Sequence, residues 1–297
     1  MFKYWIYIFG QFCVNYLPLS VSYRLATWLS DIHYFLSFRD RRAVRENLRL
    51  VVGESKKIEP IVREVFRNFG RYLVEFFRMA KHLDDQYIQE NVRIPNLGVI
   101  DRVLKQGKGA ILLTAHIGNW ELGGVVLSRL GYPLLAIALS HKERPVNNLF
   151  NQQREHQGLR VVPIHLSIRK CLEALNQNQC VAILGDRNFS SNGQELDFLD
   201  RKVSFPKGPA LFSLRTGAPI VPIFFVRRGK NLFDLIIDEP IYPPQAIEAD
   251  LIRQNEQQMT LMRRYVQCIE NIVRTYPDQW LMFRRFWVEN PERITLS

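Results

Sequence analysis

The sequence predicts an α/β fold: a central, mostly parallel sheet covered by helices on both faces, with an N-terminal membrane-associated helical segment. Short, continuously apolar runs recur along the chain, as in strands that are buried on both sides. Segments with helical spacing separate these runs, which is the pattern of strands alternating with helices. An uncharged, aromatic-rich stretch at the start predicts the membrane-associated segment.

The N-terminal segment has no charged side chain between Tyr4 and Tyr23. Its length is close to the roughly 20 residues that cross a bilayer. Polar residues dilute it, so a spanning helix, a helix lying in the interface and a buried helix of a soluble protein all remain open. Five arginines follow: Arg39, Arg41, Arg42, Arg45 and Arg49. They would keep the rest of the chain on the cytoplasmic side of a spanning segment, or contact anionic headgroups. We expect residues 1–38 to be an anchor or interfacial helix and residues 39–297 to be a single α/β domain.

The remaining elements follow from apolar periodicity. Residues 59–80 have helical spacing. Further helices are expected at 99–104, 143–156, 168–175, 206–215 and 259–273, and another opens at Trp120. Strands are expected at 110–114, 133–139, 161–162, 181–184, 218–225 and 232–237, the last two forming a natural pair.

Composition restricts the partners. The net charge of +11 favours anionic ones, and the aromatic share of 12% points to a membrane surface rather than nucleic acid. We find no nucleic-acid recognition motif, so no such partner is expected. The four cysteines show no C-x-x-C spacing, which argues against a zinc site and against disulfides.

Candidate catalytic residues follow the predicted strands, at the edge where α/β sheets gather functional groups. His116 and Glu121 follow the strand at 110–114, and Asp186 and Arg187 follow the strand at 181–184. A neutral His can take a proton from a nucleophile, a carboxylate can fix its tautomer, and an Arg can hold an oxyanion or a phosphate. On spacing alone, His116 also fits a structural histidine, and Asp186 with Arg187 fits a local ion pair. The motifs of an enzyme nucleophile are absent, which favours direct attack by a bound acceptor.

Four short sequence motifs, or blocks, occur in order along the chain. The first is Thr-Ala-His-Ile-Gly-Asn-Trp-Glu-Leu-Gly (114–123), and the second is Leu-Gly-Asp-Arg-Asn-Phe (184–189). The third is Pro-Lys-Gly-Pro-Ala-Leu (206–211) with Leu-Arg-Thr-Gly-Ala-Pro-Ile-Val-Pro (214–222), and the fourth is Pro-Asp-Gln-Trp (277–280), which precedes two arginines. Together they resemble the lauroyl/myristoyl, or late, acyltransferases of lipid A biosynthesis. The resemblance covers about residues 40–290. Residues 195–202 depart from it, because this chain has a charged stretch where the family usually has an apolar one.

This resemblance implies transfer of a fatty acyl group from an acyl carrier protein or coenzyme A thioester onto a glycolipid, at the inner face of the plasma membrane. It implies neither a cofactor nor a metal. His116 would be the base and Glu121 its partner, while Arg187, with Asp186 beside it, would polarise the thioester carbonyl or bind phosphate. Candidate substrate contacts within the blocks are Asn119, Lys207, Arg284 and Arg285.

Two other functions stay open on the residues. A glycerophosphate-type acyltransferase shares the His-x4-acid pattern, although Glu121 stands where that class has Asp. A non-catalytic membrane-surface binding protein, with a structural His116, would also account for the basic charge and the apolar N-terminus.

Overall fold

The computed structural model describes residues 2–53, 57–189, 192–246 and 250–287, and it confirms the α/β fold. In this part of the chain a seven-stranded sheet has the order β1-β9-β8-β2-β5-β3-β4. All of its neighbouring strands run parallel except β8 and β9, which form the expected antiparallel pair. The strands are β1 (Val92–Arg93), β2 (Ala110–Thr114), β3 (Leu134–Ala138), β4 (Arg160–Pro163), β5 (Cys180–Leu184), β8 (Ile220–Gly229) and β9 (Leu232–Ile237).

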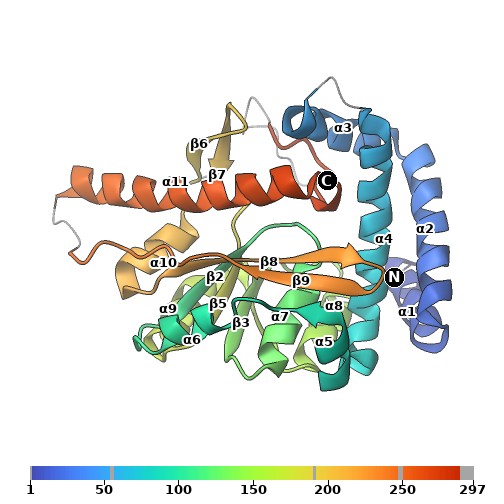
Figure 1. Cartoon of the computed structure of the whole chain (residues 1–297), viewed down its shortest axis with the longest axis horizontal. Coiled ribbons are helices and arrows are strands. Elements are labelled where there is room, and N and C mark those ends of the chain that lie inside the picture. Colours follow the sequence, from blue (N-terminus) through green and yellow to red (C-terminus); the bar gives the residue numbers. More distant parts are fainter. Residues whose placement is uncertain (1, 54–56, 190–191, 247–249, 288–297) are drawn as a thin grey trace.

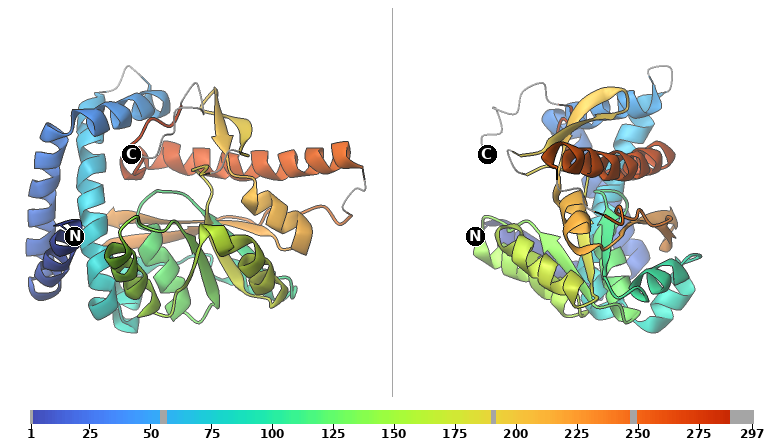
Figure 2. Two further views of the ribbon diagram at one scale, coloured as in Figure 1. Left: turned by 180° about the vertical axis from the view of Figure 1, so that it is seen from behind. Right: turned by 90° about the vertical axis from the view of Figure 1, so that its left-hand side faces the viewer.

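Helices cover both faces of the sheet (Figures 1 and 2). They are α1 (Phe2–Tyr16), α2 (Leu19–Leu36), α3 (Phe38–Val52), α4 (Ile58–His82), α5 (Asp85–Asn91), α6 (Gly98–Leu104), α7 (Trp120–Arg129), α8 (Arg144–Glu155), α9 (Ser167–Asn176), α10 (Gly208–Thr216) and α11 (Leu251–Thr275). Two short 3-10 turns lie at Ile164–Leu166 and Pro277–Gln279.

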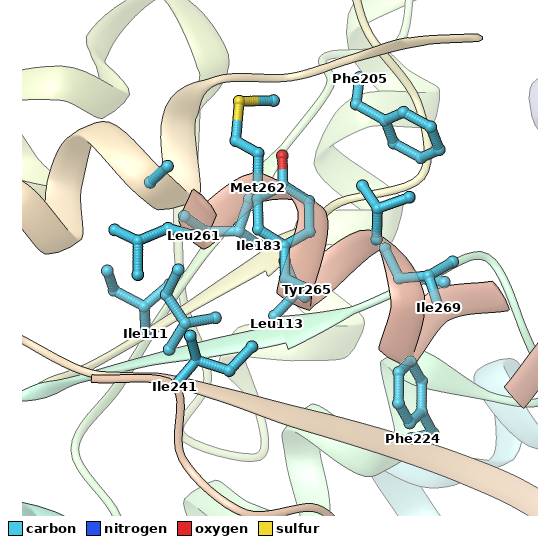
Figure 3. Packing of buried hydrophobic residues seen from close by; sticks show 14 of the residues in the cluster. Ile111, Leu113, Ile183, Phe205, Phe224, Ile241, Leu261, Met262, Tyr265 and Ile269 are labelled. Atoms are coloured by element: carbon cyan, nitrogen blue, oxygen red, sulfur yellow. The ribbon is translucent and has the colours of Figure 1, made fainter. Parts of the chain in front are cut away.

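Side chains of β2 alternate between two cores, as the strand period requires. Ile111 and Leu113 pack with α9, α10 and α11 on one face (Figure 3). Ala110 and Leu112 pack on the other face with α6, α7, α8 and the end of α4. Because β2 is fully buried on both sides, the loop that follows it starts from a rigid support.

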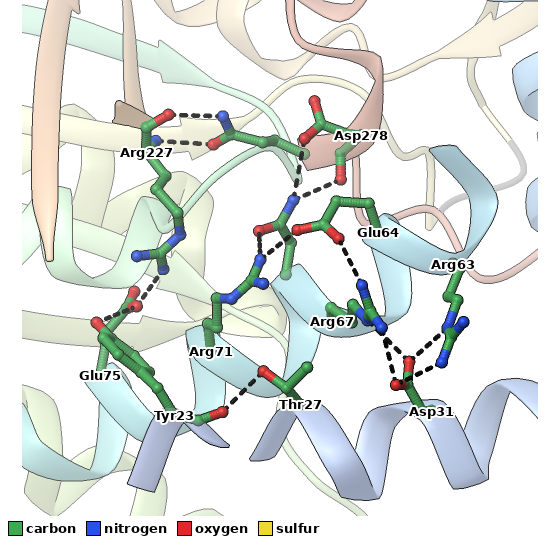
Figure 4. A network of polar contacts seen from close by, with 12 residues as sticks. Tyr23, Thr27, Asp31, Arg63, Glu64, Arg67, Arg71, Glu75, Arg227 and Asp278 are labelled. Carbon is green, nitrogen blue, oxygen red and sulfur yellow. Dashed lines mark hydrogen bonds and ion pairs between the residues drawn. The ribbon is translucent and has the colours of Figure 1, made fainter. Parts of the chain in front are cut away.

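The uncharged N-terminal stretch forms two helices rather than one. The chain turns at Leu17 and Pro18, where Pro cannot continue the first helix. Helix α2 then lies along α4, and Asp31 on α2 pairs with Arg63 and Arg67 on α4 at 2.7–2.9 Å (Figure 4). Among the described helices, none is both long and apolar enough to cross a bilayer.

Several elements were not expected. Residues 195–202, the charged stretch, lie in a separate antiparallel hairpin of β6 (Gln194–Phe198) and β7 (Arg201–Phe205). Helix α11 begins at Leu251, eight residues before the expected start, because Asp250 caps it by accepting a hydrogen bond from the amide of Arg253. Strand β1 and helix α5 were too short to give a periodic signal.

Candidate active site

His116 and Asp186 meet at the carboxyl edge of the sheet. Strands β2 and β5 are parallel neighbours, and Thr114 is registered opposite Leu184. His116 comes two residues after the end of β2, and Asp186 comes two residues after the end of β5. The two side chains therefore lie opposite each other at the edge of the sheet. Asp186 Oδ1 lies 2.7 Å from His116 Nδ1, and its Oδ2 accepts a 2.9 Å hydrogen bond from the His116 amide.

The Asp186 carboxylate fixes the chemistry of the imidazole. Burial raises the pKa of Asp186, but the ring and amide of His116, together with Arg187, outweigh it and hold that pKa below its ordinary value. An ionised carboxylate only accepts hydrogen bonds, so Nδ1 of His116 must donate. The lone pair of the neutral ring then lies on Nε2, which has no hydrogen-bond partner in the described chain. The His116 side chain is 12% exposed and the Asp186 side chain 0%.

Glu121 does not hold the imidazole, so the expectation that it orients His116 is wrong in this respect. It makes a bidentate ion pair with Arg154 of α8, with distances of 2.6 and 2.7 Å. Five residues after His116, Glu121 lies in the first turn of α7 and faces α8, whereas Nδ1 faces β5. Any part of Glu121 in the reaction itself stays a prediction. Trp120, its neighbour, packs edge-on against the His116 ring at 5.1 Å.

The loop carrying His116 is held from the opposite side by residues 279–281. The amide of Gly118 donates to the carbonyl of Gln279 at 2.9 Å, and the amide of Leu281 donates to the carbonyl of His116 at 2.8 Å. Gly118 has φ +60°, and a Cβ there would lie 2.0 Å from the Phe225 carbonyl oxygen of β8. Glycine is therefore required for the chain to pass this close to β8. These contacts join the block at 277–280 to the block that contains His116.

A buried charge network supports the same loop from α4. Glu75, 4% exposed, accepts a hydrogen bond from Asn119 Nδ2 at 2.7 Å. It also accepts one from Tyr23 at 2.8 Å and pairs with Arg227 of β8 (Figure 4). Asn119 was a candidate substrate contact, but both ends of its amide are used, because Oδ1 caps α7 through the Leu122 amide. Burial and the charge of Glu75 raise the pKa of Tyr23 far above its ordinary value, so its hydroxyl remains a donor.

The other predicted site residues separate into two groups. Arg187, the residue directly after Asp186, and Arg284 both lie over the ring of Phe189. Their guanidinium carbons are 5.6 and 5.5 Å, respectively, from the centre of that ring. Arg285 is turned away and pairs with Glu46 of α3 at 2.7 Å. Lys207 is the residue before α10, and no hydrogen bond in the described chain joins it to His116 or Asp186. Among the described residues no cluster of three His, Cys, Asp or Glu could hold a metal.

Comparisons with known proteins agree on one family. The sequence model of the bacterial lipid A biosynthesis acyltransferases matches residues 1–289. A phosphatidylinositol mannoside acyltransferase of Mycolicibacterium smegmatis is 26% identical over 82% of this chain and 79% of its own length. Its counterpart in Mycobacterium tuberculosis is 28% identical over 76% of this chain and 73% of its own. A lipid A biosynthesis palmitoleoyltransferase of Escherichia coli is 24% identical over 89% of this chain and 92% of its own.

Proposed function

The chain belongs to the bacterial lipid A biosynthesis acyltransferase family, and from this membership we propose that it moves a fatty acyl group from a thioester onto a sugar hydroxyl of a membrane glycolipid. The thioester is carried by an acyl carrier protein or by coenzyme A. One observation supports this reaction above the others: a partly exposed His116 whose Nδ1 is bound to the buried carboxylate of Asp186.

In the proposed reaction His116 is the general base. Its Nε2 takes the proton of the acceptor hydroxyl while the hydroxyl oxygen attacks the thioester carbonyl carbon. The carbon–sulfur bond then breaks, and the thiolate receives the same proton from the imidazolium. The products are an ester and a free thiol. Asp186 keeps the ring in the tautomer that can accept at Nε2, and its charge stabilises the imidazolium that forms between the two steps.

The acceptor is proposed to be an anionic glycolipid. The relatives named above act on phosphatidylinositol mannoside or take part in lipid A biosynthesis, and both names describe acylated glycolipids. The net charge of +11 also favours an anionic lipid and an acidic carrier protein.

The test is an acyl-transfer assay with the purified protein. Labelled acyl-coenzyme A and acyl carrier protein are each offered with a phosphatidylinositol mannoside, an under-acylated lipid A precursor or a lysophosphatidate. Mass spectrometry should find one glycolipid heavier by one acyl chain. Transfer to lysophosphatidate alone would favour a glycerophosphate-type enzyme. Vesicle binding without transfer to any acceptor would favour a non-catalytic binding protein.

The enzyme is further proposed to dock on the membrane through α1 and α2, without crossing it. Both helices expose large apolar side chains. On α1 these are Trp5, Ile6, Phe9, Phe12 and Tyr16, whose spacing places them on one side of the helix. On α2 they are Leu25, Trp28, Leu29, Phe35 and Leu36. Each is at least 41% exposed. A patch of this size and aromatic content is typical of a helix pair lying in the headgroup region.

Replacing Trp5 and Phe9 by Glu should weaken partition onto anionic vesicles at least tenfold, because each large apolar side chain contributes about 1.5–3 kcal/mol when buried. Sedimentation with vesicles measures the change. The matched control replaces Leu251 and Ile252, which are 73% and 70% exposed at the start of α11, by Glu. Equal binding of both variants would contradict docking through α1 and α2.

A further inference from the structure

Arg187 and Arg284 are two cations for which the described part of the chain provides no acceptor. In the described chain neither guanidinium has an ion-pair or hydrogen-bond partner, and Nε of Arg187 is buried and unpaired. Two other part-buried arginines have carboxylate partners. Arg154 pairs with Glu121, and Arg227 pairs with Glu75, although Nη1 of Arg227 is also buried without a hydrogen-bond partner in the described chain. A buried donor left without an acceptor costs about 1–3 kcal/mol, so the missing acceptor is expected to come from a ligand.

The two guanidinium groups also repel each other. Burial, and then the charge of Arg284, lower the pKa of Arg187 to about 10, and burial lowers the pKa of Arg284 in the same direction. Both groups therefore remain charged at neutral pH. Positive charge held together in this way is stabilised by an anion, and perturbed pKa values of this kind gather at functional sites.

The charge of Asp186 acts to raise the pKa of both arginines, but in the described chain Asp186 makes no hydrogen bond or ion pair with either of them. Its oxygens already accept hydrogen bonds from the His116 amide and ring, and from the Trp280 indole at 3.4 Å. With His116 neutral, the two arginines and Asp186 carry one net positive charge. A phosphate diester, with one negative charge, would neutralise this net charge. A phosphate monoester with two negative charges would leave one negative charge in excess.

The positions of both arginines are fixed. Arg187 follows Asp186 directly, and the backbone around Arg284 is held by Asn47 of α3. The Asn47 amide donates to the carbonyls of Arg284 at 2.7 Å and Met282 at 3.1 Å, and its oxygen accepts from the Phe286 amide at 3.0 Å. Phe189, whose ring both arginines contact, is 46% exposed, so the cluster opens to solvent.

We propose that Arg187 and Arg284 together bind a phosphate ester group of a substrate beside the His116–Asp186 pair. This inference rests on the proposed function and sharpens it. A carbonyl oxyanion carries one developing charge at one atom, and the several N–H groups and the single charge of one guanidinium are enough for it. A phosphate offers several oxygens, and the planar forks of two arginines match that geometry. The phosphate belongs either to the donor carrier or to the acceptor headgroup.

Steady-state kinetics of Arg187→Ala, Arg284→Ala and the double variant test the site. Each single change should raise the KM of the phosphate-bearing substrate about ten- to hundredfold and change kcat less than threefold, as expected for losing charged hydrogen bonds in binding. Arg285→Ala is the matched control, since Arg285 is the next residue and pairs with Glu46 at the surface. It should keep both constants. A fall in kcat at constant KM in the Arg187 or Arg284 variants would overturn the proposal and indicate oxyanion stabilisation.

Two substrate pairs identify the source of the phosphate. Acyl-coenzyme A is compared with acyl-pantetheine, which lacks phosphate, and the phosphorylated acceptor is compared with its dephosphorylated form. The wild type should prefer the phosphorylated member of one pair, and the double variant should lose that preference. Equal discrimination by wild type and double variant in both pairs would overturn the site.

A binding measurement separates failure of this site from failure of the proposed reaction. Calorimetric titration with inorganic phosphate should show binding to the wild type and to Arg285→Ala, but not to the double variant. This result supports the site even if no acyl transfer is found. Equal titrations of wild type and double variant contradict the site even if transfer is found. Thermal melting checks the folding of each variant. Folding is expected to be retained, because Arg187 and Arg284 have no ion pair to lose in the described chain and the Arg285–Glu46 pair of the control is exposed.

Discussion

Asp186→Asn should lower kcat for acyl transfer by about 10³–10⁴ while the protein remains folded. The side chain keeps its shape, but its amide can present an N–H toward Nδ1 of His116. The ring then takes the other tautomer, with its proton on Nε2, and no longer accepts a proton from the acceptor hydroxyl. The imidazolium also loses the charge that stabilises it. Single-turnover assays with saturating thioester measure the chemical step directly.

The same assay decides whether Asp186 or Glu121 is the acid that acts with His116. Glu121→Gln is the comparison, because Glu121 pairs with Arg154 and not with the imidazole. Its main expected effect is on stability, with a smaller loss of kcat than in Asp186→Asn. The double variant His116→Ala/Asp186→Asn should be no slower than His116→Ala, since the two residues act as a unit. A small loss in Asp186→Asn beside a large loss in Glu121→Gln would restore Glu121 as the partner.

The sequence located both members of the pair but assigned the wrong partner. His116 and Asp186 each follow an apolar strand, so their place at the carboxyl edge of the sheet could be predicted. That β5 is the neighbour of β2 could not, because strand order depends on how helices pack over the sheet and not on local periodicity. Glu121 was expected to be the partner because it is only five residues from His116 in the sequence, whereas Asp186 is 70 residues from His116.

Long-range charge pairs were missed for a related reason. Glu75 lies among apolar residues of α4, and its partner Arg227 follows 152 residues later at the end of an apolar strand. Neither position has a local signal of pairing. A single charged residue within a strongly apolar helix face is the one indication that could have been used, since such a residue needs a buried partner. The uncharged N-terminal stretch was correctly predicted to be helical. Its division at Pro18 follows from the proline itself, whereas its packing on α4 depends on tertiary contacts.

Glu75→Ala should destabilise the protein by about 3–5 kcal/mol, the usual cost of breaking a buried ion pair from one side. The Arg227 side chain is 14% exposed and would keep its charge without a carboxylate. The Asn119 amide and the Tyr23 hydroxyl would lose their acceptor as well. Urea denaturation gives the free energy of unfolding. As a control, Glu173→Ala removes the partner of two exposed cations, Arg169 and Lys170, and should change the free energy of unfolding far less than Glu75→Ala does.

A second variant distinguishes the unpaired charge from the lost packing. Replacing Glu75 by Leu and Arg227 by Met together removes both charges, and it should recover much of the stability lost in Glu75→Ala. Catalysis should not recover with it, because Asn119 still lacks the carboxylate that holds the start of α7 and the His116 loop. Full recovery of kcat in the double variant would show that the loop is fixed by Gln279 and Leu281 alone. Recovery of stability without kcat would show that Glu75 positions the base through Asn119.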